Sequence, residues 1–212
     1  MAKLLITGFD PFAGETVNPS WKAVRHLNGA IIGGFEVITH EIPTVFEAAF
    51  TIVQSHIERH QPAVVIGVGQ AGGSNAIRVE CLAKNRIDAR KQDNEGNQPK
   101  NALIAIDGPA HYPASIPFEN MAKQIEIEGI SAHLSNSAGA FVCNELFYST
   151  LHYVKSHNLP IRVGFIHVPY LPEQVANKKR AGLPSMAEET VVRALTVAIE
   201  AIGDDLSIPF AN

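Results

Sequence analysis

Cys143 and His167 are the residues whose type and placement fit nucleophilic catalysis. Cys143 follows the small residues 137–140 and lies near the predicted start of a helix. A thiol in the first helical turn faces unpaired backbone N–H groups and the positive end of the helix dipole, which favour the reactive thiolate. The same N–H groups can stabilise an oxyanion once the thiolate attacks a carbonyl. The alternative is a reduced thiol packed under a sheet, because small residues often precede helices.

His167 lies in the apolar segment 162–168, where an imidazole without a partner would be costly. Pro169 ends this predicted strand, which places His167 at the edge where open α/β sheets bind ligands. The helix over residues 141–158 immediately precedes the strand, so Cys143 and His167 can reach the same edge. The pattern therefore predicts a Cys–His dyad and the chemistry of a cysteine hydrolase.

Glu80 is the best candidate for the group that orients the histidine. It follows the glycine-rich turn 67–73 and lies among apolar residues, where an unpaired carboxylate would be expensive. A third group that holds the imidazole is the usual companion of such a dyad. The alternative, an exposed position on a hairpin, stays open at this point.

Three other patterns fit known motifs only in part. Residues 67–72 match G-x-G-x-x-G, but residues 76–82 alternate like a strand where a dinucleotide site requires a helix. His56 and His60 have the i, i+4 spacing of metal ligands, yet the sequence is H-x-E-x-H and no third ligand is evident. No G-x-S-x-G elbow of a serine hydrolase is present. We therefore predict glycines that turn the chain beside a pocket, two histidines on a solvated helix face, and no metal site.

The elements that must position these residues alternate along the chain. Apolar runs predict strands at residues 3–9, 35–42, 63–68, 132–135 and 162–168, and a strand-like alternation covers 76–82. Helices are predicted at 44–60, between Pro117 and Gly129, at 141–158 and after 185, the first and last with capping boxes at 44–47 and 185–188. This order predicts one domain over residues 1–212, with three α/β/α layers and a mostly parallel twisted sheet of the phosphorylase or hydrolase type. Residues 84–116, rich in Asn, Asp, Gly and Pro, predict an irregular excursion or small hairpin.

Composition argues against several classes of protein. The 212 residues are 46% hydrophobic and carry a formal net charge of −4, which disfavours a nucleic-acid binder. The basic run Lys178-Lys179-Arg180 is too short to change this. We expect no signal peptide and no membrane span, since no apolar segment approaches about 18 residues. The two cysteines, Cys81 and Cys143, are expected to be reduced.

Six motifs in a fixed order extend along the whole chain. They are Gly8-Phe9-Asp10-Pro11-Phe12 with Asn18-Pro19-Ser20-Trp21, Val68-Gly69-Gln70-Ala71-Gly72-Gly73, Asp88-Ala89-Arg90, Asp93-Asn94-Glu95-Gly96-Asn97-Gln98-Pro99, Phe141-Val142-Cys143-Asn144, and Gly164-Phe165-Ile166-His167-Val168-Pro169-Tyr170-Leu171-Pro172-Glu173-Gln174. Together they resemble the pyroglutamyl-peptidase I family, also called pyrrolidone-carboxylate peptidases. The resemblance implies a cysteine peptidase that removes an N-terminal pyroglutamyl residue from peptides, with a thioester acyl-enzyme as the expected intermediate.

The resemblance also implies roles for individual residues. Glu80, Cys143 and His167 would form a triad, and Arg90 would lie near the oxyanion. The lactam pocket would draw on Phe9, Phe12, Asn18, Gln70, Phe141 and Val142. Phe9 and Phe12 suit apolar walls, unless they only pack in the core, and Asn18 and Gln70 suit polar anchors. The family resemblance further implies no cofactor, a cytoplasmic location and a homotetramer.

The chain departs from the family pattern at three places. The family usually has glycine at Ala13, arginine at Cys81, and Ile-Pro at Lys91-Gln92. The second departure affects the support of Glu80, and the third would place a charge in a pocket wall. Two rival functions stay open: a nucleoside-phosphorylase-like enzyme, which could share this α/β architecture, and a domain that binds pyroglutamyl peptides without cleaving them, which the departures at Cys81 and Lys91 support.

Overall fold

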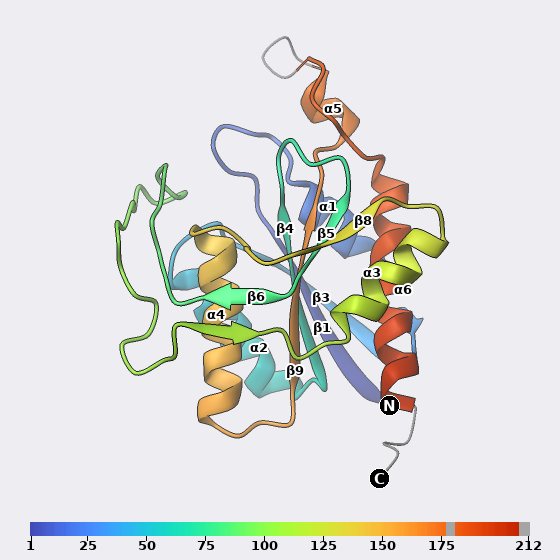
Figure 1. The fold of residues 1–212 in the computed structure, drawn as a ribbon, viewed down its shortest axis with the longest axis horizontal. Coiled ribbons are helices and arrows are strands. Elements are labelled where there is room, and N and C mark those ends of the chain that lie inside the picture. The colour runs from blue at the N-terminus through green and yellow to red at the C-terminus, as the bar shows by residue number, and fades with distance from the viewer. Residues whose placement is uncertain (177–180, 208–212) are drawn as a thin grey trace.

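A seven-stranded sheet lies between two layers of helices in the computed structural model, which describes residues 1–176 and 181–207 (Figure 1). The strand order is β2 (Ile31–Ile32), β3 (Phe35–Ile42), β1 (Ala2–Phe9), β4 (Val64–Gln70), β9 (Arg162–Val168), β5 (Ile77–Glu80) and β8 (Ala132–Ser135). Strand β2 pairs antiparallel with β3 and β5 with β9, and the other pairings are parallel. The predicted α/β class with a mostly parallel sheet is confirmed.

The helices divide between the two faces of the sheet. Helices α2 (Ala48–His60) and α4 (Val142–Ser156) pack together on one face. On the other face lie α1 (Pro19–Val24) with the short 3-10 turn η1 (Arg25–Leu27), α3 (Phe118–Ile127) and α6 (Glu188–Ser207). The short helix α5 (Pro172–Val175) follows β9. Strands β1, β4 and β9 are buried on both faces, which explains why their sequences are nearly continuous apolar runs.

Both predicted capping boxes are wrong. Helix α2 begins at Ala48, and the Thr44 backbone N–H donates to Asp10 Oδ1 at 2.7 Å instead of to the Glu47 side chain, as a capping box would require. Glu47 then takes a left-handed φ of 61° and caps the helix without a side-chain bond. Ser185 lies in a bridge with Tyr170, and α6 begins three positions later. In each case a contact distant in sequence overrides the local motif.

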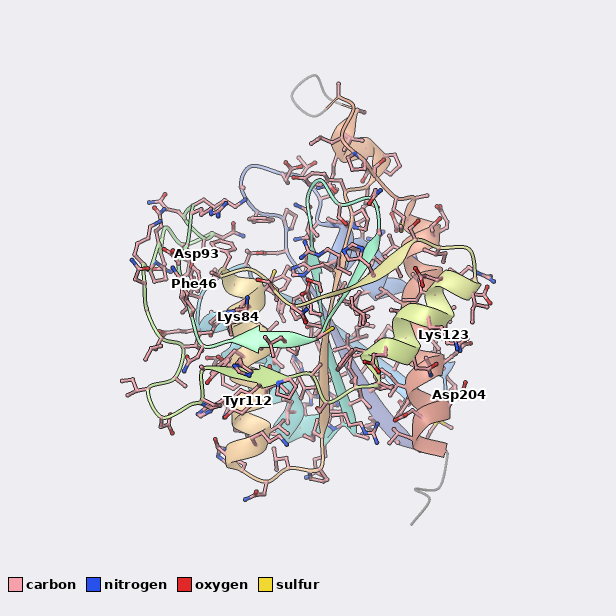
Figure 2. The ribbon with its side chains drawn as sticks, in the orientation of Figure 1. Phe46, Lys84, Asp93, Tyr112, Lys123 and Asp204 are labelled. Carbon is pink, nitrogen blue, oxygen red and sulfur yellow. The ribbon has the colours of Figure 1, made fainter. Side chains whose placement is uncertain are left out.

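The irregular segment expected at 84–116 has a two-stranded base, β6 (Leu82–Lys84) paired with β7 (His111–Pro113). Two buried polar residues organise the loop between them. Asn85 Oδ1 accepts the backbone N–H groups of residues 104 and 105, and its amide donates to carbonyls 105 and 108. Asp93 accepts N–H groups from Phe46, Glu95 and Asn97, bonds that lower the pKa of Asp93 although burial alone would raise it. The loop is therefore held to the segment before α2, where Figure 2 labels Phe46 and Asp93 side by side.

Both cysteines are free thiols, as expected. Within the described residues, no helix has the length and apolar character that crossing a membrane requires. The basic run Lys178-Lys179-Arg180 lies outside the described residues.

Glu145 on α4 gives the first prediction, which concerns stability. Its side chain is buried; Oε1 accepts from Ser149 Oγ, and Oε2 has no protein partner. Burial raises the pKa of Glu145 from 4.5 to about 7, although bonds from Ser149 and the Glu47 backbone lower it. Because the folded-state pKa is raised, the associated stability is present below pH 4.5 and is lost as pH rises through 7.

We expect Glu145→Gln to increase the free energy of unfolding at pH 8 by up to roughly 3 kcal/mol, since 2.5 pKa units correspond to about 1.36 kcal/mol each. The gain should shrink toward pH 5. Urea unfolding at the two pH values measures it, with Glu126→Gln on the exposed face of α3 as control. Equal effects of Glu145→Gln at both pH values would rule out an ionised buried carboxylate.

Candidate active site

The structure brings Glu80, Cys143 and His167 together from β5, α4 and β9. His167 Nδ1 lies 2.9 Å from Glu80 Oε1, and the Cys143 side chain lies close enough to the ring to raise the pKa of His167. Strand β9 pairs with β4 so that His167 lies beside Gly69. A Cβ on Gly69 would come within 2.9 Å of Cys143 Sγ and 3.1 Å of His167 Nε2. Glycine at this position therefore leaves room for the Cys–His contact.

The electrostatic setting of His167 favours its protonated form. Burial by itself would lower the pKa of His167, but hydrogen bonds to Cys143 and Glu80, and their charges, raise it to about 9. The imidazole thus keeps its proton at neutral pH. A protonated ring can pair with a thiolate and can donate a proton to a leaving group.

Arg78 is a residue that the sequence analysis missed. Its Nε lies 3.6 Å from Glu80 Oε1, and its Nη2 donates to Ser135 Oγ at 2.9 Å. Glu80 is fully buried, so this cation supports its carboxylate although Cys81 replaces the family's usual arginine. The sequence did contain an indication of this pair. Arg78 and Glu80 are residues i and i+2 of a strand, so they share a face, and they carry opposite charges.

Cys143 lies in the first turn of α4, as predicted. The residue before the helix, Phe141, is extended and makes no side-chain cap bond. No capping side chain from this position therefore occupies the N–H groups of the first turn. Asn144, fully buried, accepts from the Lys84 N–H and donates to the carbonyls of Lys84 and Arg86. This amide, which the sequence analysis also missed, fixes the start of α4 against the segment after β6.

A cavity of about 660 Å³ opens beside the thiol. Of the residues expected to bind substrate or support the oxyanion, Phe9, Phe12, Asn18, Gln70, Phe141 and Arg90 line it together with Cys143 and His167. The Val142 side chain does not line it and is fully buried in the core. The volume lies in the usual range for small-ligand sites.

Asn18 and Gln70, two polar residues of the lining, differ in which of their hydrogen-bonding groups already have a protein partner. Asn18 caps α1, since its Oδ1 accepts from the Ser20 N–H and Oγ while its Nδ2 donates to the Asp10 carbonyl. Gln70 Oε1 accepts from Gln174 Nε2 at 2.9 Å, so the NH₂ is the Gln70 group that can donate to a ligand. Gln70 is therefore the better donor for a ligand carbonyl.

The outer part of the cavity is basic. Among the described residues, its lining includes four basic side chains, those of Lys84, Arg86, Arg90 and Lys91. The lining includes one acid, Asp88, which pairs with Arg86 at 3.0 Å. Lys91 Nζ lies 4.3 Å from the centre of the Phe12 ring. Figure 2 shows Lys84 beneath the loop that carries Asp93. The third departure from the family pattern thus lies in the cavity wall, next to a predicted pocket residue.

Ala13, the first departure, has a φ of 55°. The backbone therefore takes the left-handed conformation for which glycine is suited, at a cost to alanine of about 1–2 kcal/mol.

Comparisons with known proteins agree with the geometry. The family model for pyroglutamyl peptidase matches residues 2–205. A pyrrolidone-carboxylate peptidase of Bacillus licheniformis is 48% identical over 196 residues, covering 92% of this chain and 90% of the relative. The crystal structure of pyroglutamyl peptidase I from Bacillus amyloliquefaciens superposes with a TM-score of 0.92 at 44% identity, covering 96% and 98% of the two chains. A variant of pyrrolidone carboxyl peptidase from Pyrococcus furiosus also reaches 0.92, at 39% identity and 96% and 99% coverage.

Proposed function

The chain belongs to the pyroglutamyl peptidase family, a family of hydrolases, and we propose that it removes N-terminal pyroglutamate from peptides with Cys143, His167 and Glu80 as its catalytic triad. The observation that carries the proposal is the continuous contact from the Cys143 thiol through the His167 ring to the buried Glu80 carboxylate. Each member comes from a different element, and nucleophilic catalysis needs such a chain of contacts.

The reaction follows from this geometry in two halves. The Cys143 thiolate attacks the carbonyl carbon of the peptide bond that follows pyroglutamate. Its oxygen becomes an oxyanion held by N–H groups at the start of α4, with Arg90 nearby. The His167 imidazolium gives its proton to the leaving amine as the C–N bond breaks, which leaves a thioester on Cys143. The neutral His167 then takes a proton from water, whose oxygen attacks the thioester and releases pyroglutamate. Glu80 holds the ring tautomer and balances its charge.

Recognition of the uncharged lactam rests on the mixed lining of the cavity. Phe12 and Phe141, with ring centres 6.1 Å apart, provide apolar walls, and Phe9 lies deeper in the core. The Gln70 NH₂ serves as donor to the lactam carbonyl, and Asn18 keeps the loop before α1 in place. The Val142 side chain acts through packing at the helix start.

One incubation tests this function against its rivals. The protein should release the fluorophore from a pyroglutamyl-coumarin amide without added phosphate, and iodoacetamide should abolish the release. A nucleoside-phosphorylase-like enzyme would require phosphate and would survive alkylation. A binding domain would retain the substrate and release nothing.

Lys91 gives a prediction about the residue after pyroglutamate. Because the outer cavity is basic, we expect Lys91→Ile to lower kcat/KM about two- to fivefold for peptides with glutamate after pyroglutamate and to leave alanine peptides nearly unchanged. Added salt should reduce the difference, since exposed charges are screened. Lys100→Ile, outside the cavity, is the control. An equal loss for both peptides would mean that Lys91 acts on packing alone.

A cytoplasmic location and a homotetramer complete the proposal. The two free thiols fit a reducing compartment, and the family resemblance supports the assembly.

A further inference from the structure

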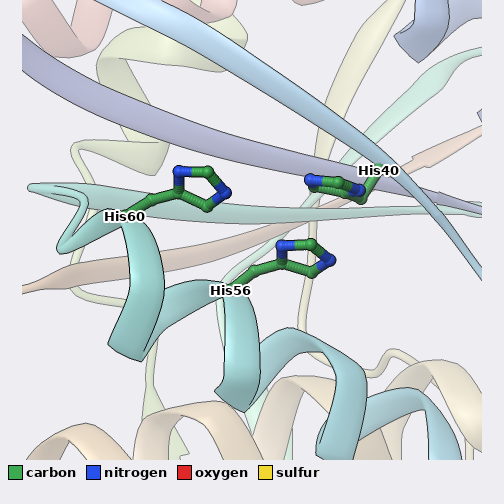
Figure 3. A group of neighbouring side chains, drawn as sticks. All are labelled: His40, His56 and His60. Carbon is green, nitrogen blue, oxygen red and sulfur yellow. The ribbon is translucent and has the colours of Figure 1, made fainter.

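Three histidines that the catalytic proposal does not use meet at one end of α2. His56 and His60 were expected on a solvated helix face without a third ligand, but His40 of β3 lies beside them and all three rings are only partly exposed. Figure 3 shows the three rings turned toward a common space between the strand and the helix. One ring nitrogen from each lies within 4.8 Å of the others.

The fold explains why these side chains converge. His56 and His60 are one helical turn apart and share a face of α2. Strand β3 alternates, so His40 lies on the opposite face of the sheet from the buried residues Val37 and Thr39. Strand β2 is short and pairs only with the first two residues of β3. It therefore does not extend along β3 as far as His40. The rings of His40 and His56 stack with centres 3.4 Å apart.

Two nitrogens in this cluster are buried without a hydrogen-bond partner among the residues that the structure describes. They are His56 Nδ1 and His60 Nε2. A buried polar atom without a partner costs about 1–3 kcal/mol. Where these nitrogens carry a lone pair, a bound cation supplies the missing partner.

The surroundings favour the neutral form of the three rings. Burial lowers the pKa of His56 to about 4, helped by the charges of His40, His60 and Arg59. Burial likewise lowers the pKa of His40, with His60 and Arg59 contributing. For His60, burial, Arg59 and Lys3 lower the pKa and Glu36 opposes them. Neutral imidazole is the form that binds metal, and here it does not have to lose a proton first.

We propose that His40, His56 and His60 form a site for a divalent transition metal of the zinc class, with water completing the coordination. Imidazole suits Zn²⁺, Co²⁺, Ni²⁺ and Cu²⁺, and three histidines are a known zinc ligand set. The metal would join β3 to α2. None of the three histidines lines the cavity beside Cys143, so the site is separate from the catalytic residues.

The test must separate this site from the Cys143–His167 pair, which also offers a zinc ligand set. Isothermal titration with Zn²⁺, and the visible absorption of Co²⁺, are therefore measured on full-length Cys143→Ala protein. We expect one metal per chain. Adding His56→Gln or His60→Gln should weaken binding at least 100-fold, and adding the exposed His133→Gln should not change it.

Thermal unfolding supplies the second readout. Zn²⁺ should raise the Tm of Cys143→Ala protein, because a ligand that binds only the folded state stabilises it. The same Zn²⁺ should leave the Tm of the His56 and His60 variants unchanged, and their unfolding without metal shows that they fold. His40→Gln replaces either variant that does not fold. The proposal is overturned if Cys143→Ala protein binds no metal, or if the histidine variants bind it as well as their parent.

Discussion

Cys143→Ala is expected to lower kcat/KM on a pyroglutamyl-coumarin amide by a factor on the order of 10⁴ or more, because it removes the nucleophile. Cys81→Ala should keep most of the activity. The Cys81 thiol contacts the Val79 carbonyl weakly at 3.8 Å, and burial raises the pKa of Cys81 although a bond from the Ser135 backbone lowers it. Steady-state assays of the two variants at pH 7 measure the difference.

These two cysteines form a matched pair of variants. Both are partly exposed, and each variant loses one sulfur atom. Circular dichroism of both checks that the fold persists. Retained turnover in the Cys143 variant would disprove the mechanism, and loss in the Cys81 variant alone would make Cys81, between β5 and β6, the nucleophile.

Glu80→Gln is expected to lower kcat by roughly 10²- to 10⁴-fold, as loss of the orienting carboxylate does in other triads. It should also shift the pH dependence. Both the hydrogen bond and the charge of Glu80 raise the pKa of His167, so their loss lowers that pKa. Because His167 acts as a protonated acid, the alkaline limb of the pH–rate profile should move to lower pH.

The full pH–rate profile of Glu80→Gln separates this role from a structural one. Glu119→Gln, an exposed position on α3, serves as the control and should keep both the rate and the profile of the parent. An unchanged rate and alkaline limb in Glu80→Gln would demote Glu80 to a residue that only fills the core.

Two of the three proposed catalytic residues, His167 and Glu80, could be predicted from the sequence because each is a polar residue in an apolar segment. A histidine at the end of an apolar strand and a carboxylate among apolar residues both require partners. The carboxyl ends of the parallel strands β4 and β9 place His167 and Gln70 at one edge of the sheet. The antiparallel pairing of β5 with β9, which sets Arg78 opposite His167, had no local signal and had to come from the tertiary structure.

The predictions that were wrong also depend on contacts between segments distant in sequence. Thr44 and Ser185 begin plausible capping boxes, but bonds to Asp10 and a bridge to Tyr170 recruit their backbones elsewhere. His40 is 16 positions before His56 and lies on a strand, so helical spacing could not indicate it. Side chains that meet across β3 and α2 depend on the packing of the two elements.

The most direct test of the account is to trap the acyl-enzyme. The protein is mixed with a pyroglutamyl p-nitrophenyl ester, which acylates faster than an amide, and is quenched in acid before peptide mapping by mass spectrometry. The account predicts one pyroglutamyl group on the peptide that contains Cys143 and none on the peptide that contains Cys81. A pyroglutamyl group on Cys81, or steady turnover with Cys143 alkylated beforehand, would contradict it.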